Sequence, residues 1–98
     1  MYEQFEDVVN TDNRIKFAMA AYNCGLGHVR DAQRLADVRG LDRHVWTDNV
    51  EIAIRDLSLP KHYSKPFVKY GYVRGSEPAL YIEQIFERYD HYKQFISR

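Results

Sequence analysis

The stretch RIKFAMAAYNCGLG, residues 14–27, is the most apolar run with helical spacing in the chain. Its apolar residues form two stripes, Ile15, Ala18, Met19 and Tyr22 on one side and Phe17, Ala20, Ala21 and Cys24 on the other. Because apolar side chains then cover the helix all round, the pattern predicts a buried central helix. Gly25 and Gly27 are expected to end this helix, since glycine favours the left-handed conformation of a helix C-cap.

The composition is that of one folded domain of 98 residues, 45% hydrophobic and 14% aromatic. Fourteen basic residues balance fourteen acidic ones, so no net field favours nucleic acid as a partner. Cys24 is the single cysteine, which excludes an internal disulfide. No run approaches the roughly 20 apolar residues of a membrane helix. The acidic start, MYEQFEDVV, does not look like a signal peptide.

The segments on either side of the central helix are also predicted to be helical. Residues 2–9 read as the end of a helix, and Thr11 or Asp12 is the expected cap of the central helix. Residues 28–38 form the next predicted helix, which Gly40 closes. Its expected inward residues are Val29, Ala32, Leu35 and Ala36, and its expected outward residues are Arg30, Asp31, Arg34 and Asp37.

The second half of the chain predicts two more helices and one long loop. Thr47 or Asp48 is expected to cap a helix that ends at Pro60, with Glu51 completing a capping box. A long irregular loop follows at about residues 60–76, and such loops are often functional. The last predicted helix carries an apolar stripe of Ile82, Ile85, Phe86 and Tyr89. Without any strand pattern, the fold class is all-α with four to five helices.

Two pairs of residues are candidates for a binding site. Asn23 is either a helix-end amide satisfied by nearby backbone or a side chain at a cleft wall that pairs with a ligand amide or hydroxyl. Its neighbour Tyr22 is a core residue in one interpretation, and its hydroxyl then needs a partner. Glu77 begins the last helix, where it complements the helix dipole, and Tyr81 lies one turn further on the same face.

Other suggestive residues favour structural roles. The sequence Gly-Leu-Gly-His at 25–28 precedes a helix, but a tight helix–helix corner fits it better than an anion site. No i, i+4 pair occurs among the histidines, so neither a metal site nor a cofactor is predicted for His28, His44, His62 and His91. Glycines break the helix between Cys24 and His28, so a Cys–His nucleophile is not expected.

Two segments resemble a known family. Residues 20–32, AAYNCGLGHVRDA, resemble the Ala-Tyr-Asn motif of SLT-type lytic transglycosylases. The later Leu-Pro-x-x-Tyr at 59–63 and Tyr-Gly-Tyr-x-Arg-Gly-x-Glu-x-x-x-Tyr-Ile-x-x-Ile at 70–85 are similar to the membrane-bound F type of these enzymes. The resemblance covers about residues 14–92. It implies a goose-lysozyme-like helical fold. It also implies that the intact enzymes act on peptidoglycan, in the periplasm or at the outer membrane.

The resemblance also implies a reaction and a set of site residues. In the family, one glutamate protonates the oxygen between N-acetylmuramic acid and N-acetylglucosamine and then takes the proton of the muramic 6-hydroxyl. A 1,6-anhydro product forms without hydrolysis and without a metal. Tyr22, Asn23, Glu77 and Tyr81 match positions that line or support the glycan cleft. Tyr22 would lie near the acid, Asn23 would contact a sugar, and Glu77 and Tyr81 would brace the opposite wall.

The family's catalytic Glu-Ser motif and its Gly-Leu-Met-Gln motif precede Ala-Tyr-Asn, and neither occurs in the 20 residues before Ala21. We therefore expect residues 1–98 to form a single, partial domain, the C-terminal half of a lysozyme-like (SLT) domain, without the catalytic acid and without cleavage by these residues alone. It is either part of an active lytic transglycosylase or a non-catalytic half-domain that self-associates or binds glycan weakly. Because a helix apolar all round lacks half its usual neighbours here, a homo-oligomer through an exposed apolar face is expected. A third possibility is a generic helical interaction module whose resemblance is accidental.

Overall fold

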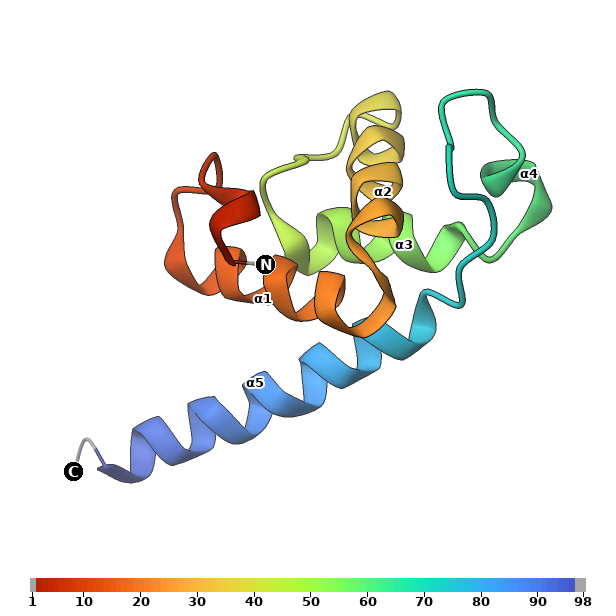
Figure 1. The fold of residues 1–98 in the computed structure, drawn as a ribbon. Coiled ribbons are helices and arrows are strands. Elements are labelled where there is room, and N and C mark those ends of the chain that lie inside the picture. Colours follow the sequence, from red (N-terminus) through yellow and green to blue (C-terminus); the bar gives the residue numbers. More distant parts are fainter. Residues whose placement is uncertain (1, 97–98) are drawn as a thin grey trace.

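The computed structural model describes residues 2–96, and the side chains of residues 2–90. Every regular element in this range is helical, which confirms the all-α class (Figure 1). The elements in order are η1 (Tyr2–Phe5), α1 (Thr11–Cys24), α2 (Leu26–Val38), η2 (Trp46–Val50), α3 (Glu51–Asp56), α4 (Pro60–Tyr63) and α5 (Ser76–Ile96). None of the helices within residues 2–96 combines the length and the apolar character needed to span a membrane.

Helix α1 is the centre of the packing, as its apolar pattern predicts. It contacts η1, α2, η2 and α5, and the ring of Phe17 contacts Phe5 of η1 and Trp46 of η2. That ring stacks on Phe5 at 5.2 Å between centroids and meets the edge of Trp46 at 5.7 Å. All three aromatic side chains are fully buried. Complete burial of one such side chain contributes about 2–3 kcal/mol, so the three together contribute about 6–9 kcal/mol.

The expectation that α1 is buried all round is wrong. Only Phe17, Ala20 and Ala21 are buried, whereas Ile15 is 37% exposed and Tyr22 82% exposed. The helix therefore buries one face and leaves the other to solvent. Ala20 and Ala21 lie on the buried face, and of the opposite stripe Met19 packs partly against the core.

The N-terminal part differs from the prediction in two respects. Residues 2–9 contain a single 3₁₀ turn, η1, because Phe5 and Val8 turn into the core while Val9 is 95% exposed. The N-cap of α1 is Asn10 rather than Thr11 or Asp12. Its side-chain oxygen accepts the N–H of Asn13 at 2.9 Å, which satisfies a donor of the first turn that has no partner within the helix.

Helix α2 follows α1 after one residue, Gly25, which has φ 105° and serves as the C-cap of α1 and the N-cap of α2. This confirms the tight helix–helix corner. Gly27, by contrast, is not a stop signal but the second residue of α2. At the other end, Gly40 has φ 76° and closes the helix as predicted.

The predicted capping of α3 and the role of Pro60 are both wrong. Asp48 adopts φ 62° in a kink, and the N-cap of α3, Val50, has no side-chain cap. The side chain of Asn49 instead stabilises this turn, since it accepts the N–H of Asp42 at 2.9 Å. Pro60 does not end α3 but occupies the first turn of the short helix α4, where a missing N–H costs nothing. Val50, Ile54 and Leu57 are buried as expected.

After α4 the chain runs without regular structure from residue 64 to residue 75 and then enters α5. The predicted loop at 60–76 is therefore confirmed except for one helical turn at its start. Helix α5 crosses beneath α1 and extends beyond the body of the molecule, which gives overall dimensions of 50 × 24 × 23 Å (Figure 1).

Candidate functional site

Tyr22 and Asn23 lie on the solvent side of the last turn of α1, just before the Gly25 corner. Both side chains are exposed, so Tyr22 is not a core residue. Neither side chain has a hydrogen-bond partner among the residues that the structure describes, so the Asn23 amide is not satisfied by nearby backbone. A side-chain amide that the fold does not use is available to pair with a ligand.

Glu77 and Tyr81 lie in the first turns of α5, at the same end of the molecule (Figure 1). The two helices are antiparallel, and the register is set where the ammonium of Lys16 lies 4.8 Å from the centroid of the Phe86 ring. Asn23 lies seven residues after Lys16 on α1, a distance of about 10 Å along the helix axis. In the antiparallel α5, the same distance before Phe86 leads to about residue 79. Asn23 therefore lies at about the level of α5 residues 77–81. The four predicted residues therefore come from two adjoining helix ends.

The carboxylate of Glu77 is exposed, and its Oε1 atom lies 3.8 Å from Nη1 of Arg74. Tyr81 is 38% exposed. An ion pair this open to solvent contributes little to stability, so Glu77 has no strong structural role. Both side chains are accessible to a ligand.

Sequence reasoning missed Asp31, a buried carboxylate that three donors contact. It was expected to face outward but is fully buried on α2. Its Oδ1 atom accepts the N–H of Lys69 at 3.0 Å and its Oδ2 atom accepts the N–H of Tyr70 at 2.8 Å. Nη2 of Arg34, one turn away, lies 2.5 Å from Oδ1 and balances the buried charge. No local signal reveals this role, because the partners lie 38 and 39 residues further along the chain.

The ring of Tyr70 rests on the α1–α2 corner. A Cβ atom at Gly27 would lie 2.7 Å from carbons of this ring, so only glycine permits the observed approach. The ring of His28 meets the same tyrosine at 6.3 Å between centroids. Tyr70 is nevertheless 60% exposed. The loop therefore presents the ring of Tyr70 beside Gly27, which follows Asn23 by four residues.

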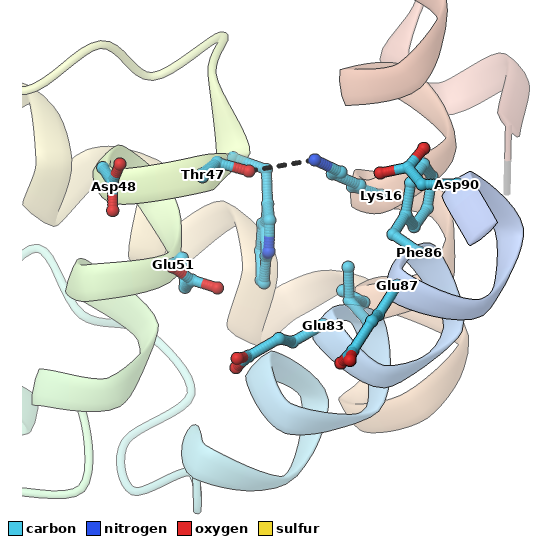
Figure 2. A pocket seen from close by; sticks show the side chains of 10 residues that line it. Lys16, Thr47, Asp48, Glu51, Glu83, Phe86, Glu87 and Asp90 are labelled. Atoms are coloured by element: carbon cyan, nitrogen blue, oxygen red, sulfur yellow. Dashed lines mark hydrogen bonds between the residues drawn. The ribbon is translucent and has the colours of Figure 1, made fainter. Parts of the chain in front are cut away.

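A separate cleft of about 530 Å³ lies between α1, the η2–α3 kink and α5 (Figure 2). Its walls carry five carboxylates and one ammonium, and its lining residues are Lys16, Trp46, Thr47, Asp48, Glu51, Ile82, Glu83, Phe86, Glu87 and Asp90. Lys16 donates to the hydroxyl of Thr47 at 3.0 Å across the cleft mouth. The indole N–H of Trp46 has no acceptor among the residues that the structure describes. The sequence interpretation did not predict this cleft, because its residues come from three distant segments.

Two other predictions concern reactive groups. Within residues 2–90, no three His, Cys, Asp or Glu side chains converge as metal ligands, and the side chain of His91 lies outside the described residues. Burial raises the pKa of the Cys24 thiol to about 11, and its sulfur donates to the carbonyl of Ala20 at 3.2 Å. A thiol that keeps its proton is a poor nucleophile, in line with the expectation of no Cys–His chemistry.

Comparison with curated proteins confirms the resemblance: the chain is a relative of lytic transglycosylases, similar over nearly its whole length to their C-terminal part. The matched proteins are named membrane-bound lytic murein transglycosylase F. Identity is 47% over 87 residues with that of Maricaulis maris, which covers 89% of this chain. It is 42% over 90 residues with that of Shewanella frigidimarina and 42% over 88 residues with that of Pseudomonas fluorescens.

The chain spans 18% of the length of each of these three relatives. No protein-family profile matches it.

Proposed function

We propose that this chain supplies part of the glycan cleft of a peptidoglycan lytic transglycosylase, with Tyr22, Asn23, Glu77 and Tyr81 as its wall residues. The observation that carries the proposal is the 47% identity over 87 residues to a relative named as a murein transglycosylase. Murein is peptidoglycan, so its glycan strand is the proposed ligand. As the relatives are named membrane-bound, the proposed place of action is the periplasmic side of the envelope.

The exposed side chains at the end of α1 and the start of α5 support the assignment of these wall residues. The free Asn23 amide offers two donors and one acceptor, which suits the acetamido and hydroxyl groups of an N-acetylated sugar. The exposed rings of Tyr22 and Tyr81 combine an apolar face with a hydroxyl, as a sugar ring requires. Glu77, near Arg74, can accept a hydroxyl of the strand from the α5 side.

The same proposal places the catalytic acid outside these 98 residues. A general acid must keep its proton near neutral pH, which requires a poorly solvated pocket. No glutamate among the described residues 2–90 is buried. The chain therefore contributes walls to the cleft, and the proton donor is expected from another segment.

Binding to N-acetylglucosamine oligomers, measured by calorimetry, tests the proposal. Asn23→Ala should weaken binding by roughly three- to tenfold, the effect of one or two hydrogen bonds. Gln84→Ala is the matched control, because Gln84 is an exposed amide on α5 outside the proposed wall. Equal affinities for the two variants, or no binding by the wild type, would contradict the proposal.

Incubation with purified peptidoglycan tests the absence of the acid. No anhydro-muropeptides above the blank are expected by mass spectrometry. Their appearance would show that one of the exposed carboxylates serves as the proton donor, and the assignment of the acid to another segment would be wrong.

Self-association is a second candidate, favoured by large apolar side chains that α1 and α5 leave exposed. Ile15 is 37% exposed, Tyr22 82%, and Leu80 51%. An apolar surface on two adjoining helices can bury itself against a second copy. Light scattering should then show a dimer or larger species at high micromolar concentration, and a monomer would count against it.

A further inference from the structure

Four of the fourteen basic residues of this neutral protein lie in one stretch that has no acidic residue. Residues 57–76 contain no acidic residue, and they carry Lys61, Lys65, Lys69 and Arg74. Lys61, Lys69 and Arg74 are exposed, and Lys65 is partly exposed. Five carboxylates line the separate cleft between α1, the η2–α3 kink and α5. Residues 61–75, here called the basic segment, therefore form a local cationic surface on a chain of zero net charge.

The basic segment also presents aromatic rings. Tyr70 is 60% exposed and Tyr72 is 56% exposed. Each is supported on one side by another ring, Tyr70 by His28 and Tyr72 by Tyr63 at 5.9 Å between centroids. Most of the surface of both rings remains free. Each tyrosine combines an apolar ring face with a polar hydroxyl, which suits contact with a ligand that has both apolar and polar groups.

The segment is irregular in secondary structure but fixed in position. Buried Asp31 holds the backbone N–H groups of Lys69 and Tyr70. Nε of Arg34 donates to the carbonyl of Phe67 at 3.2 Å. At the far end, the buried Gly75 lies so close to the Ile54 carbonyl that a Cβ atom would overlap it. The tyrosines and lysines are thus presented by a loop that is anchored at its middle and at its end.

The anchoring places this surface next to the proposed cleft wall. Tyr70 rests on Gly27, in the corner that begins two residues after Asn23. Figure 1 shows the segment running alongside α2 before it enters α5. A strand that contacts Asn23 at the corner can therefore continue over Tyr70 toward Tyr72.

We propose that the basic segment is a second contact surface for the glycan strand, in which Tyr70 and Tyr72 pack against sugar rings and the lysines attract carboxylates of the attached peptide stems. The inference rests on the proposed function and names the parts of the substrate that this surface recognises. Aromatic rings suit the apolar faces of pyranose rings, and ammonium groups pair with carboxylates. Because the charges are exposed, they act mainly by attracting the strand over several ångströms.

The test compares a neutral N-acetylglucosamine oligomer with soluble peptidoglycan strands that carry their peptide stems. At about 20 mM salt, the wild type should bind the strands roughly tenfold more tightly than the neutral oligomer. At about 0.5 M NaCl this advantage should disappear, since the Debye length falls to about 4 Å. Lys61→Gln/Lys69→Gln should lose most of the advantage without weakening binding of the neutral oligomer.

The control is Lys16→Gln/Arg88→Gln, which removes the same charge away from the basic segment and should keep the advantage. Tyr72→Ala should weaken both ligands several-fold, and Tyr72→Phe should restore them because the ring rather than the hydroxyl makes the contact. Equal behaviour of the two charge variants would overturn the inference while leaving the proposed function in place. A wild type that binds neither ligand would overturn both. Tighter binding to single-stranded DNA than to the strands would also overturn the inference.

Discussion

Replacing Asp31 by alanine should destabilise the protein by about 3 kcal/mol. Each hydrogen bond from a buried donor to a charged acceptor contributes about 1.5–3 kcal/mol, and Asp31 accepts two such bonds. The ion pair with Arg34 adds less than about 1 kcal/mol, since the Arg34 side chain is 31% exposed and can turn to water. The sum lies at the lower end of these ranges because the loop can move to hydrate its N–H groups.

Urea unfolding measures this loss directly. With an m-value of about 1–1.5 kcal/mol/M for a domain of this size, the midpoint should fall by roughly 2–3 M without a change in m. Asp31→Asn keeps one acceptor oxygen but turns its NH₂ group toward the second backbone donor. It should therefore cost about half to two-thirds as much as the alanine variant.

The control is Asp37→Ala on the same helix, where the Asp37 side chain is 43% exposed and pairs with Arg43 at 2.9 Å. A pair this exposed should contribute less than about 1 kcal/mol. In Asp31→Ala, the amides of Lys69 and Tyr70 should also exchange with solvent about a hundredfold faster than in the wild type. If the unfolding free energies of Asp31→Ala and Asp37→Ala agreed within about 0.5 kcal/mol, roughly the error of such a measurement, Asp31 would not stabilise the loop as predicted.

Further predictions concern Gly75, Cys24 and Asn10. Gly75→Ala should cost roughly 3 kcal/mol or more in urea unfolding, since its Cβ would overlap the Ile54 carbonyl. Gly40 has open space around it and φ 76°, so Gly40→Ala should cost only about 1 kcal/mol. Similar losses of stability in the two variants would contradict this geometry. Cys24 keeps its proton until about pH 11, so its alkylation at pH 8 should be roughly a hundredfold slower in the folded than in the urea-unfolded protein. Because its folded pKa is the higher one, its contribution to stability is present below about pH 8.5 and is lost as the pH rises toward 11. Asn10→Ala removes the cap of α1 and should cost about 1 kcal/mol, as thermal unfolding would show; an unchanged melting temperature would argue against the cap.

The parts of the fold that were predictable from sequence are those that depend on local periodicity. Val29, Ala32 and Ala36 repeat at helical spacing and are buried as expected, because burial on a helix follows from its own 3.6-residue period. The same rule failed for Asp31, which lies among them. A carboxylate on a helix is expected to face water unless a distant segment supplies donors, and nothing near it in the sequence indicates that Lys69 and Tyr70 do so.

The candidate site shows the same division. Tyr22 was located by motif, but its exposure could not be predicted, since that depends on which faces of α1 the other helices cover. Pro60 was expected to end α3 but lies in the first turn of α4, because proline is tolerated in the first turn of a helix as readily as it ends one. The acidic cleft could not have been found at all, since α1, the η2–α3 kink and α5 meet there only after folding.

The anchored loop has a consequence for binding that its sequence alone would not suggest. A stretch of twelve residues without regular structure, 64–75, would ordinarily lose conformational entropy when it meets a ligand. Here Asp31 and the close approach of Gly75 to Ile54 already hold it, so folding rather than binding bears that loss. The rings of Tyr70 and Tyr72 are therefore preorganised. Weakening the hydrogen bonds from Lys69 and Tyr70 to Asp31 should therefore weaken glycan binding even in variants that remain folded. A folded Asp31→Asn protein with unchanged affinity would show that the loop needs no such support.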